Sequence, residues 1–231
     1  MSEYGKLITP RGNLPVYIDR PMYEPAPVVL VLHEVFGVDG NARRTCRVLA
    51  QEGFIAVCPD LFWRHAAGVS LDHRSLDDWK KGMAIYYAYD FNAGVSDVYA
   101  AQVVGRELPG SNGKVGVIGY CLGGLLSYLV SVRFDPDVAI SYYGEGIEKY
   151  LAEASGLTTP LVLHFACDDE VISLHDQQRI GAVYAGSDLV TIYSYRGCRH
   201  AFARYGGANY DEVAARLANE RTLAFLGKYL H

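Results

Sequence analysis

The most restrictive feature of this chain is the segment 114–130, where an apolar run, a glycine-rich turn and a second apolar run follow one another. Its centre, residues 119–124, reads GYCLGG. This order is typical of a nucleophile elbow, a sharp turn that joins a strand to a helix and presents one side chain at the end of a sheet. Glycines at 119 and 123 flank that side chain because a larger residue would clash with the neighbouring backbone. The segment therefore predicts a strand–turn–helix unit with Cys121 at its apex.

A cysteine stands at this apex where elbows usually carry a serine, and a thiol is activated differently from a hydroxyl. A free cysteine is more often a small buried hydrophobic residue. We expect that ordinary role for the other four, which are Cys46, Cys58, Cys167 and Cys198. An odd number of cysteines without C-x-x-C spacing argues against a disulfide framework and against a zinc site. No metal ligands are therefore assigned.

Composition excludes several classes of protein. The chain has 231 residues with a formal net charge of −5, which leaves no surplus of basic residues for nucleic acid. No apolar run approaches the ~18 residues that span a membrane. The first residues lack the charged-then-apolar pattern of a signal peptide, so a cytoplasmic protein without membrane or nucleic-acid partners is expected.

Strand-like and helix-like segments alternate with short turns along the chain, which is typical of an α/β fold with a mostly parallel sheet. The run Val28–His33 fits a strand buried on both faces. We expect one α/β domain over residues 1–231, with helices on both faces of the central sheet. The further expected strands are a hairpin at Lys6–Thr9 and Leu14–Ile18, then Phe54–Cys58, Val138–Tyr143, Pro160–Ala166 and Leu189–Tyr195. The expected helices are Asn41–Glu52, Asp77–Ala88, Ala93–Leu108 and Tyr210–Leu230, with a long loop over 60–76.

An elbow nucleophile needs a general base and a group that orients that base. In elbow-bearing α/β enzymes the chain order is nucleophile, acid, histidine. Asp169 follows one expected strand and His200 follows the next, so both lie in loops at the same sheet edge as Cys121. An aspartate after a strand is also a common helix cap, which is the interpretation that fits Asp168. The sequence therefore predicts a Cys121–Asp169–His200 triad.

Glu34 leaves a buried strand at its carboxyl end, where it would face the elbow across the sheet. A solvated loop carboxylate is an equally good interpretation from spacing alone. The backbone N–H of Val35, which follows this acid, is a candidate oxyanion donor together with the N–H of Leu122. An elbow fold builds its oxyanion hole from these two places.

Taken together, the motifs resemble those of the dienelactone hydrolase family, the carboxymethylenebutenolidases of aromatic-compound degradation. The resemblance covers nearly the full length, and the cysteine elbow with the Phe-Gly motif is its most specific part. The matching segments are 33–38 (HEVFGV), 56–61 (AVCPDL), 111–124 (SNGKVGVIGYCLGG), 142–144 (YYG), 200–204 (HAFAR) and 217–222 (LANERT).

The resemblance implies an α/β-hydrolase that needs no metal or organic cofactor. It implies that Cys121, Asp169 and His200 form the triad and that Glu34 is the additional glutamate that interacts with the nucleophile. In the family's proposed mechanism, an anionic substrate engages an arginine and frees the glutamate, which then takes the thiol proton. A thiol that stays protonated until the substrate binds is protected from oxidation. Arg204 matches one arginine of the family, and the resemblance adds Phe36 and Tyr143 to the expected substrate-binding residues.

The chain departs from the family pattern at two positions. Trp79 stands where the family has a second arginine, and Met83 stands where it has a tyrosine. Both are retained as candidate substrate-binding residues, with ordinary helix packing as the alternative. The side chains that could compensate are Arg64, Lys80, Lys81 and Tyr86, although a lysine offers a point charge rather than a planar fork.

The first hypothesis is a hydrolase that opens a small anionic enol lactone, dienelactone to maleylacetate, in aromatic or chloroaromatic degradation. A carboxylesterase or thioesterase of other small acyl substrates is the alternative. A non-catalytic ligand-binding protein on the same scaffold is a third reading, against which the retention of all three triad members argues. A redox role for Cys121 lacks a resolving cysteine at C-x-x-C spacing. We expect a monomer or a weak homo-oligomer.

Overall fold

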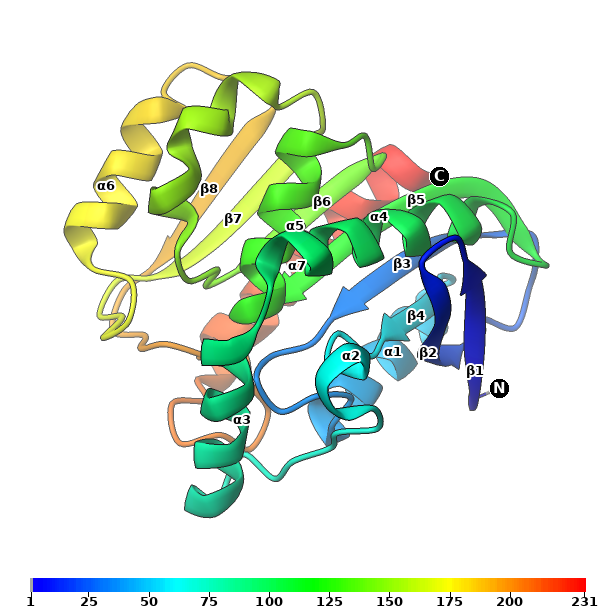
Figure 1. Cartoon of the computed structure of the whole chain (residues 1–231). Coiled ribbons are helices and arrows are strands. Elements are labelled where there is room, and N and C mark those ends of the chain that lie inside the picture. The colour runs from blue at the N-terminus through cyan, green and yellow to red at the C-terminus, as the bar shows by residue number, and fades with distance from the viewer. Residues whose placement is uncertain (1) are drawn as a thin grey trace.

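The computed structural model describes residues 2–231, and its backbone is organised around one eight-stranded sheet (Figure 1). Only Met1 of the expected domain lies outside the described residues. The order of the strands across the sheet is β1-β2-β4-β3-β5-β6-β7-β8. The strands are β1 (Ser2–Thr9), β2 (Gly12–Asp19), β3 (Ala26–Leu32), β4 (Ile55–Pro59), β5 (Ser111–Tyr120), β6 (Val138–Tyr142), β7 (Leu161–Ala166) and β8 (Val190–Tyr195).

The sheet is parallel from β4 to β8 and antiparallel only at one edge. There β1 and β2 form a hairpin, and β2 pairs antiparallel with β4. Each remaining pair is parallel. The predicted α/β fold with a mostly parallel sheet is confirmed.

Helices cover both faces of the sheet, as expected. In Figure 1, α4 and α5 lie over one face and α7 lies behind the other. A Cβ added at Gly116 of β5 would meet Leu226 and Leu230 of α7, whereas the side chain of Val115 lies close to Gly105 of α4. The helices are α1 (Gly40–Gln51), α2 (Trp63–Ala66), α3 (Leu76–Ala88), α4 (Phe91–Arg106), α5 (Leu122–Arg133), the 3₁₀ segment η1 (Ile147–Gly156), α6 (Leu174–Val183) and α7 (Glu212–Leu230).

The core explains why the central strands read as unbroken apolar runs. Every residue of Val28–Leu32 has no exposed surface, because helices cover the strand on both sides. Most helices around this core begin at a polar side chain that accepts a hydrogen bond from the first turn. These N-cap residues are Asp39, Ser75, Asp90, Ser173 and Asp211. Ser173 therefore caps α6, and the expectation that Asp168 does so is wrong.

Two local expectations also needed correction. The predicted hairpin is longer than its apolar residues indicated, because β1 pairs with β2 over its whole length from Ser2. The predicted loop over 60–76 contains the short helix α2. The indole N–H of Trp63 in this helix donates to Asp97 of α4 at 2.9 Å, a tertiary contact that local sequence does not reveal.

The loops at the carboxyl ends of β3, β5, β7 and β8 hold the four residues singled out from the sequence, which are Glu34, Cys121, Asp169 and His200. Parallel strands place these ends along one edge of the sheet. Helix α3 stands beyond this edge (Figure 1). The fold thus assembles one candidate site from loops that are distant in sequence.

Candidate active site

The elbow has the strained backbone that its glycines predict. Cys121 adopts φ 52° and ψ −112°, a left-handed conformation that costs a non-glycine residue of order 1–3 kcal/mol. Its N–H donates to the carbonyl of Tyr142 at 3.0 Å, and its carbonyl accepts from Leu125 N at 3.1 Å. A Cβ at Gly119 would lie 1.9 Å from the carbonyl oxygen of Gly123. The turn therefore closes only with glycine at this position.

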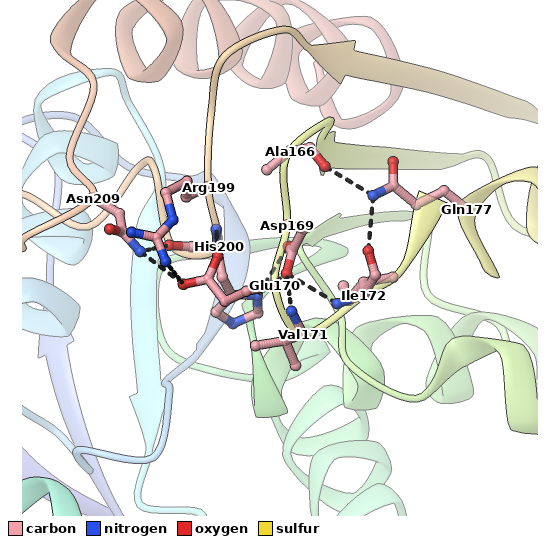
Figure 2. Close-up of polar contacts among 9 residues, drawn as sticks. All are labelled: Ala166, Asp169, Glu170, Val171, Ile172, Gln177, Arg199, His200 and Asn209. Atoms are coloured by element: carbon pink, nitrogen blue, oxygen red, sulfur yellow. Dashed lines mark hydrogen bonds and ion pairs between the residues drawn. The ribbon is translucent and has the colours of Figure 1, made fainter. Parts of the chain in front are cut away.

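Asp169, in the loop after β7, binds the imidazole of His200, in the loop after β8 (Figure 2). The Nδ1 atom of His200 lies 3.0 Å from Oδ2 and 3.1 Å from Oδ1 of this carboxylate. Oδ1 also accepts from the backbone N–H groups of Val171 at 2.8 Å and Ile172 at 3.0 Å. The Asp169 side chain has no exposed surface. It is therefore fixed in a position that orients the histidine.

The other side of the His200 ring faces the elbow thiol. Burial lowers the pKa of His200, but the negative charges of Cys121 and Asp169 and their hydrogen bonds outweigh it and raise the pKa to about 10. The imidazole thus lies between the buried carboxylate and the sulfur. This is the relation that a nucleophile, a base and an orienting acid require.

Two residues that sequence reasoning missed hold the His200 backbone (Figure 2). The backbone N–H of His200 donates to Glu170 Oε2 at 3.2 Å, and its carbonyl accepts from Asn209 Nδ2 at 2.9 Å. Asn209 also donates to Glu170 at 3.2 Å, and Arg199 pairs with the same carboxylate at 3.2 Å. No spacing rule points to these contacts, because they join the loop after β7 to the long connection between β8 and α7.

Glu34 is buried beside the site and pairs with Arg204. The Nε of Arg204 donates to Glu34 Oε2, and the two side chains are 17% and 10% exposed. Burial lowers the pKa of Arg204, but the charge of Glu34 outweighs it and leaves that pKa above its ordinary value. The guanidinium also lies 4.8 Å from the centre of the Phe36 ring. Glu34 is thus a buried, paired carboxylate rather than a solvated one.

The two expected oxyanion donors directly follow these residues in the chain. Val35 is 5% exposed and Leu122 is fully buried. Leu122 is the first residue of α5, so its N–H has no partner within the helix. Outside helices and strands, neither amide donates to another backbone group of the described chain.

Helix α3 carries the two positions that depart from the family pattern. Gly82 lets the helix approach the loop after β3, because a Cβ there would lie 2.5 Å from the carbonyl oxygen of Val35. Met83 is partly buried against the core. Trp79 is 47% exposed, and its backbone N–H donates to the carbonyl of Ser75 at 2.9 Å. Among the described residues, neither side chain makes a hydrogen bond, ion pair or ring contact with Cys121 or His200.

The candidate replacements for the second arginine lie elsewhere. The Nε and Nη2 atoms of Arg64 donate to the two carboxylate oxygens of Asp97 at 2.9 and 2.8 Å. Lys80 forms an ion pair with Asp77 at 3.8 Å, and Lys81 forms one with Asp78 at 2.9 Å. Arg204, by contrast, lies close enough to Cys121 for the sulfur to contribute to its raised pKa.

Tyr86, which lies on α3, does reach the site. Burial raises its pKa, and the nearby charges of Glu145 and Cys121 raise it further. Glu145, which sequence reasoning missed, lies close to the Tyr86 side chain. A phenol and a carboxylate therefore stand near the thiol, on the side from which α3 approaches.

Tyr143 directly follows the neighbouring strand β6 and adopts a left-handed conformation with φ 39°. Its ring lies edge-on to His200, with centroids 5.1 Å apart. Burial raises its pKa, and the charge of Glu34 adds to this.

Residues 2–231 contain no group of three histidine, cysteine or acidic side chains placed to hold a metal ion.

Comparison with known proteins identifies the family to which this chain belongs. The model of the dienelactone hydrolase family matches residues 14–230. Carboxymethylenebutenolidase of Pseudomonas putida is 38% identical over 209 residues, which cover 90% of this chain and 89% of that protein. The chain belongs to the dienelactone hydrolase family. Carboxymethylenebutenolidase 1 of Cupriavidus pinatubonensis is 35% identical over 224 residues, which cover 96% of this chain and 95% of that protein.

Solved structures agree on the fold of this family. A provisionally assigned dienelactone hydrolase from Klebsiella pneumoniae superposes with a TM-score of 0.86 at 23% identity, over 99% of both chains. A dienelactone hydrolase-like promiscuous phosphotriesterase from metagenomic libraries superposes with a TM-score of 0.80 at 18% identity, over 100% of this chain and 99% of that one. At these identities the likeness concerns the fold alone.

Membership confirms the resemblance drawn from the motifs and makes the chain a hydrolase of the dienelactone hydrolase type. The reading as a non-catalytic binding protein is therefore wrong. Within the described part of the chain, no helix combines the length and apolar character needed to cross a membrane.

Proposed function

We propose that this hydrolase opens small anionic enol lactones, dienelactone to maleylacetate, with Cys121 as nucleophile and Asp169 and His200 as its partners. The observation that carries the proposal is the placement of His200 between a buried Asp169 and the elbow thiol. Such a reaction belongs in the degradation of aromatic or chloroaromatic compounds.

Activation begins at the ion pair between Glu34 and Arg204. A substrate carboxylate competes with Glu34 for the guanidinium, since both are carboxylates and Arg204 offers a planar fork. The released Glu34 carboxylate takes the proton of the Cys121 thiol. The thiolate that results is stabilised by the charged imidazole of His200, whose own charge Asp169 stabilises.

The thiolate then attacks the lactone carbonyl, forming a carbon–sulfur bond and an oxyanion. The backbone N–H groups of Val35 and Leu122 donate to this oxyanion. Its collapse breaks the ring carbon–oxygen bond, so the acyl part remains on Cys121 as a thioester and the other end of the same molecule leaves as an enolate.

Hydrolysis of the thioester returns the enzyme to its resting state. The enolate takes a proton from water, and the hydroxide that forms adds to the thioester carbonyl. The thiolate leaves and takes back its proton from Glu34, and the product departs with both carboxylates. Glu34 then pairs with Arg204 again, which keeps the resting thiol protected from oxidation.

A second candidate function is hydrolysis of other small esters or thioesters. The charges around the thiol favour it. Among the described residues no second cation accompanies Arg204 there, and the carboxylate of Glu145 lies close to Tyr86. A nearby carboxylate repels an anionic substrate group. This candidate uses the same triad and differs only in the acyl group that the pocket accepts.

The test compares purified wild-type enzyme, Cys121→Ala and the matched variant Cys46→Ala on dienelactone isomers, aryl esters and thioesters. Cys46 is a buried cysteine on α1, away from the loops of the site. We expect lactone turnover by wild type and Cys46→Ala and none by Cys121→Ala. Failure on every dienelactone isomer would remove the substrate claim, and faster turnover of neutral esters would favour the second candidate.

A further inference from the structure

Glu145 is a carboxylate near the thiol that the proposed triad does not use. It lies in the loop after β6, between two glycines that pack against α5, the helix that follows the thiol. A Cβ added at Gly144 would lie 2.8 Å from the carbonyl carbon of Gly124, and one added at Gly146 would lie 3.5 Å from the side chain of Leu125. The loop that carries Glu145 is therefore held against the first turns of the elbow helix.

The Glu145 side chain shares a neighbour with the thiol. Tyr86 of α3 lies close to both groups, because the negative charges of Glu145 and Cys121 each raise the pKa of its phenol. The ring of Tyr86 packs edge-on against Phe91, with centroids 5.7 Å apart. Tyr86 and Glu145 are both partly buried, so water screens the charge of this carboxylate only in part.

No cation is paired with Glu145. Among residues 2–231, no lysine, arginine or histidine forms an ion pair with its carboxylate. Lys149 is the closest cation along the chain, but it is exposed, and its Nζ would lie 3.8 Å from a Cβ at Gly146. Arg204 is paired with Glu34. Glu145 therefore adds a negative charge to the side of the site from which α3 approaches.

Acyl hydrolysis at Cys121 creates a new charge beside the sulfur. The carbonyl carbon that the thiol attacks is part of an uncharged group, and the same carbon ends as a carboxylate once the thiolate has left. The groups placed to stabilise the oxyanion also attract this carboxylate. They are the imidazole of His200, whose pKa is raised to about 10, and the N–H groups of Val35 and Leu122. The site therefore needs an opposing charge to release its product.

We propose that Glu145 drives product release: its charge repels the carboxylate formed at Cys121 and does not act on the uncharged carbonyl of the substrate. The inference rests on the proposed function only in that Cys121 carries the acyl group. It holds for a lactone, an ester or a thioester, because each leaves a carboxylate at that carbon. A like charge at a partly exposed position weakens binding by about fivefold.

Product inhibition of Glu145→Gln measures this repulsion during turnover of dienelactone. We expect maleylacetate to inhibit the variant at about fivefold lower concentration than wild type, with KM for the lactone unchanged. Glu145→Asp keeps the charge and should restore wild-type inhibition. Glu148→Gln removes the same charge three residues later, on η1, and should inhibit like wild type. A lower kcat without tighter product inhibition, or an equal fall of KM, would overturn the proposal.

NMR titration of the full chain with hexanoate and hexanamide tests the same charge without using turnover. The two molecules have the same size, and only hexanoate carries a charge. We expect hexanoate to bind Glu145→Gln about fivefold more tightly than wild type and to shift the Leu122 amide signal, and hexanamide to bind both proteins equally. Equal affinities of the two proteins for hexanoate, or an unshifted Leu122 amide, would overturn the proposal. Absence of lactone turnover would remove the proposed substrate and leave this result standing.

Discussion

Replacing Glu34 by glutamine removes the counterion of Arg204 and preserves the shape of the side chain. The side chains of Arg204 and Glu34 are 17% and 10% exposed, so the pair is largely buried. Breaking a buried pair costs about 3–5 kcal/mol, and the retained amide oxygen can still accept from Arg204, which reduces the cost to about 2–3 kcal/mol. For a chain of this size that corresponds to a melting temperature about 4–12 °C lower.

The same substitution should separate the two kinetic constants for an anionic substrate. Arg204 no longer has a competing carboxylate, so KM should fall about tenfold. The base for the thiol proton is lost, so kcat should fall by about 10²–10⁴. A merely structural role for Glu34 would lower activity without improving KM.

Steady-state assays with dienelactone and thermal melts of the same preparations measure both effects. Glu153→Gln is the matched control, because Glu153 pairs with Arg133 at 2.6 Å away from the site and at greater exposure. We expect unchanged kinetics and a loss of at most about 1 kcal/mol for this control. Unchanged kcat and KM in Glu34→Gln would refute the role of the pair in activation.

Three further predictions follow from the site and the elbow. Asp169→Asn should lower kcat by about 10⁴, because the imidazole loses the carboxylate that fixes its tautomer and stabilises its charge, and retained activity would contradict this role. Cys121→Ser should lower the pKa of His200 from about 10, since a serine hydroxyl lacks the negative charge and the sulfur hydrogen bond by which Cys121 raises it, and an unshifted imidazole titration by NMR would refute that cause. Gly119→Ala should destabilise the fold by more than about 3 kcal/mol in urea unfolding, because its Cβ would overlap the elbow backbone, whereas Gly181→Ala on α6 has open space and should be neutral or stabilising.

The elements that the sequence predicted well are those with a local physical cause. The unbroken apolar run of β3 requires a strand buried on both faces, and the tight turn before the helix requires a glycine at 119. These features depend on neighbouring residues alone. Helix α2 was missed because Trp63 is held by Asp97, which comes 34 residues later.

The candidate site was predictable as a set of loop residues but not as a set of contacts. Chain order and strand ends placed Cys121, Asp169 and His200 at one edge. The partner of Glu34 lies 170 residues away, and only the folded chain joins it to Arg204. The approach of Tyr86 to the thiol likewise depends on how α3 packs, which helical periodicity does not specify.

The most direct test of the account is to identify the residue that carries the acyl group during turnover. Dienelactone is mixed with enzyme, the reaction is stopped in acid within the first turnover, and the digested protein is analysed by mass spectrometry. Because ring opening releases no fragment, the account predicts an adduct of the full substrate mass on the peptide that contains Cys121, and none in Cys121→Ala. An adduct on another residue, or full turnover by Cys121→Ala, would contradict it.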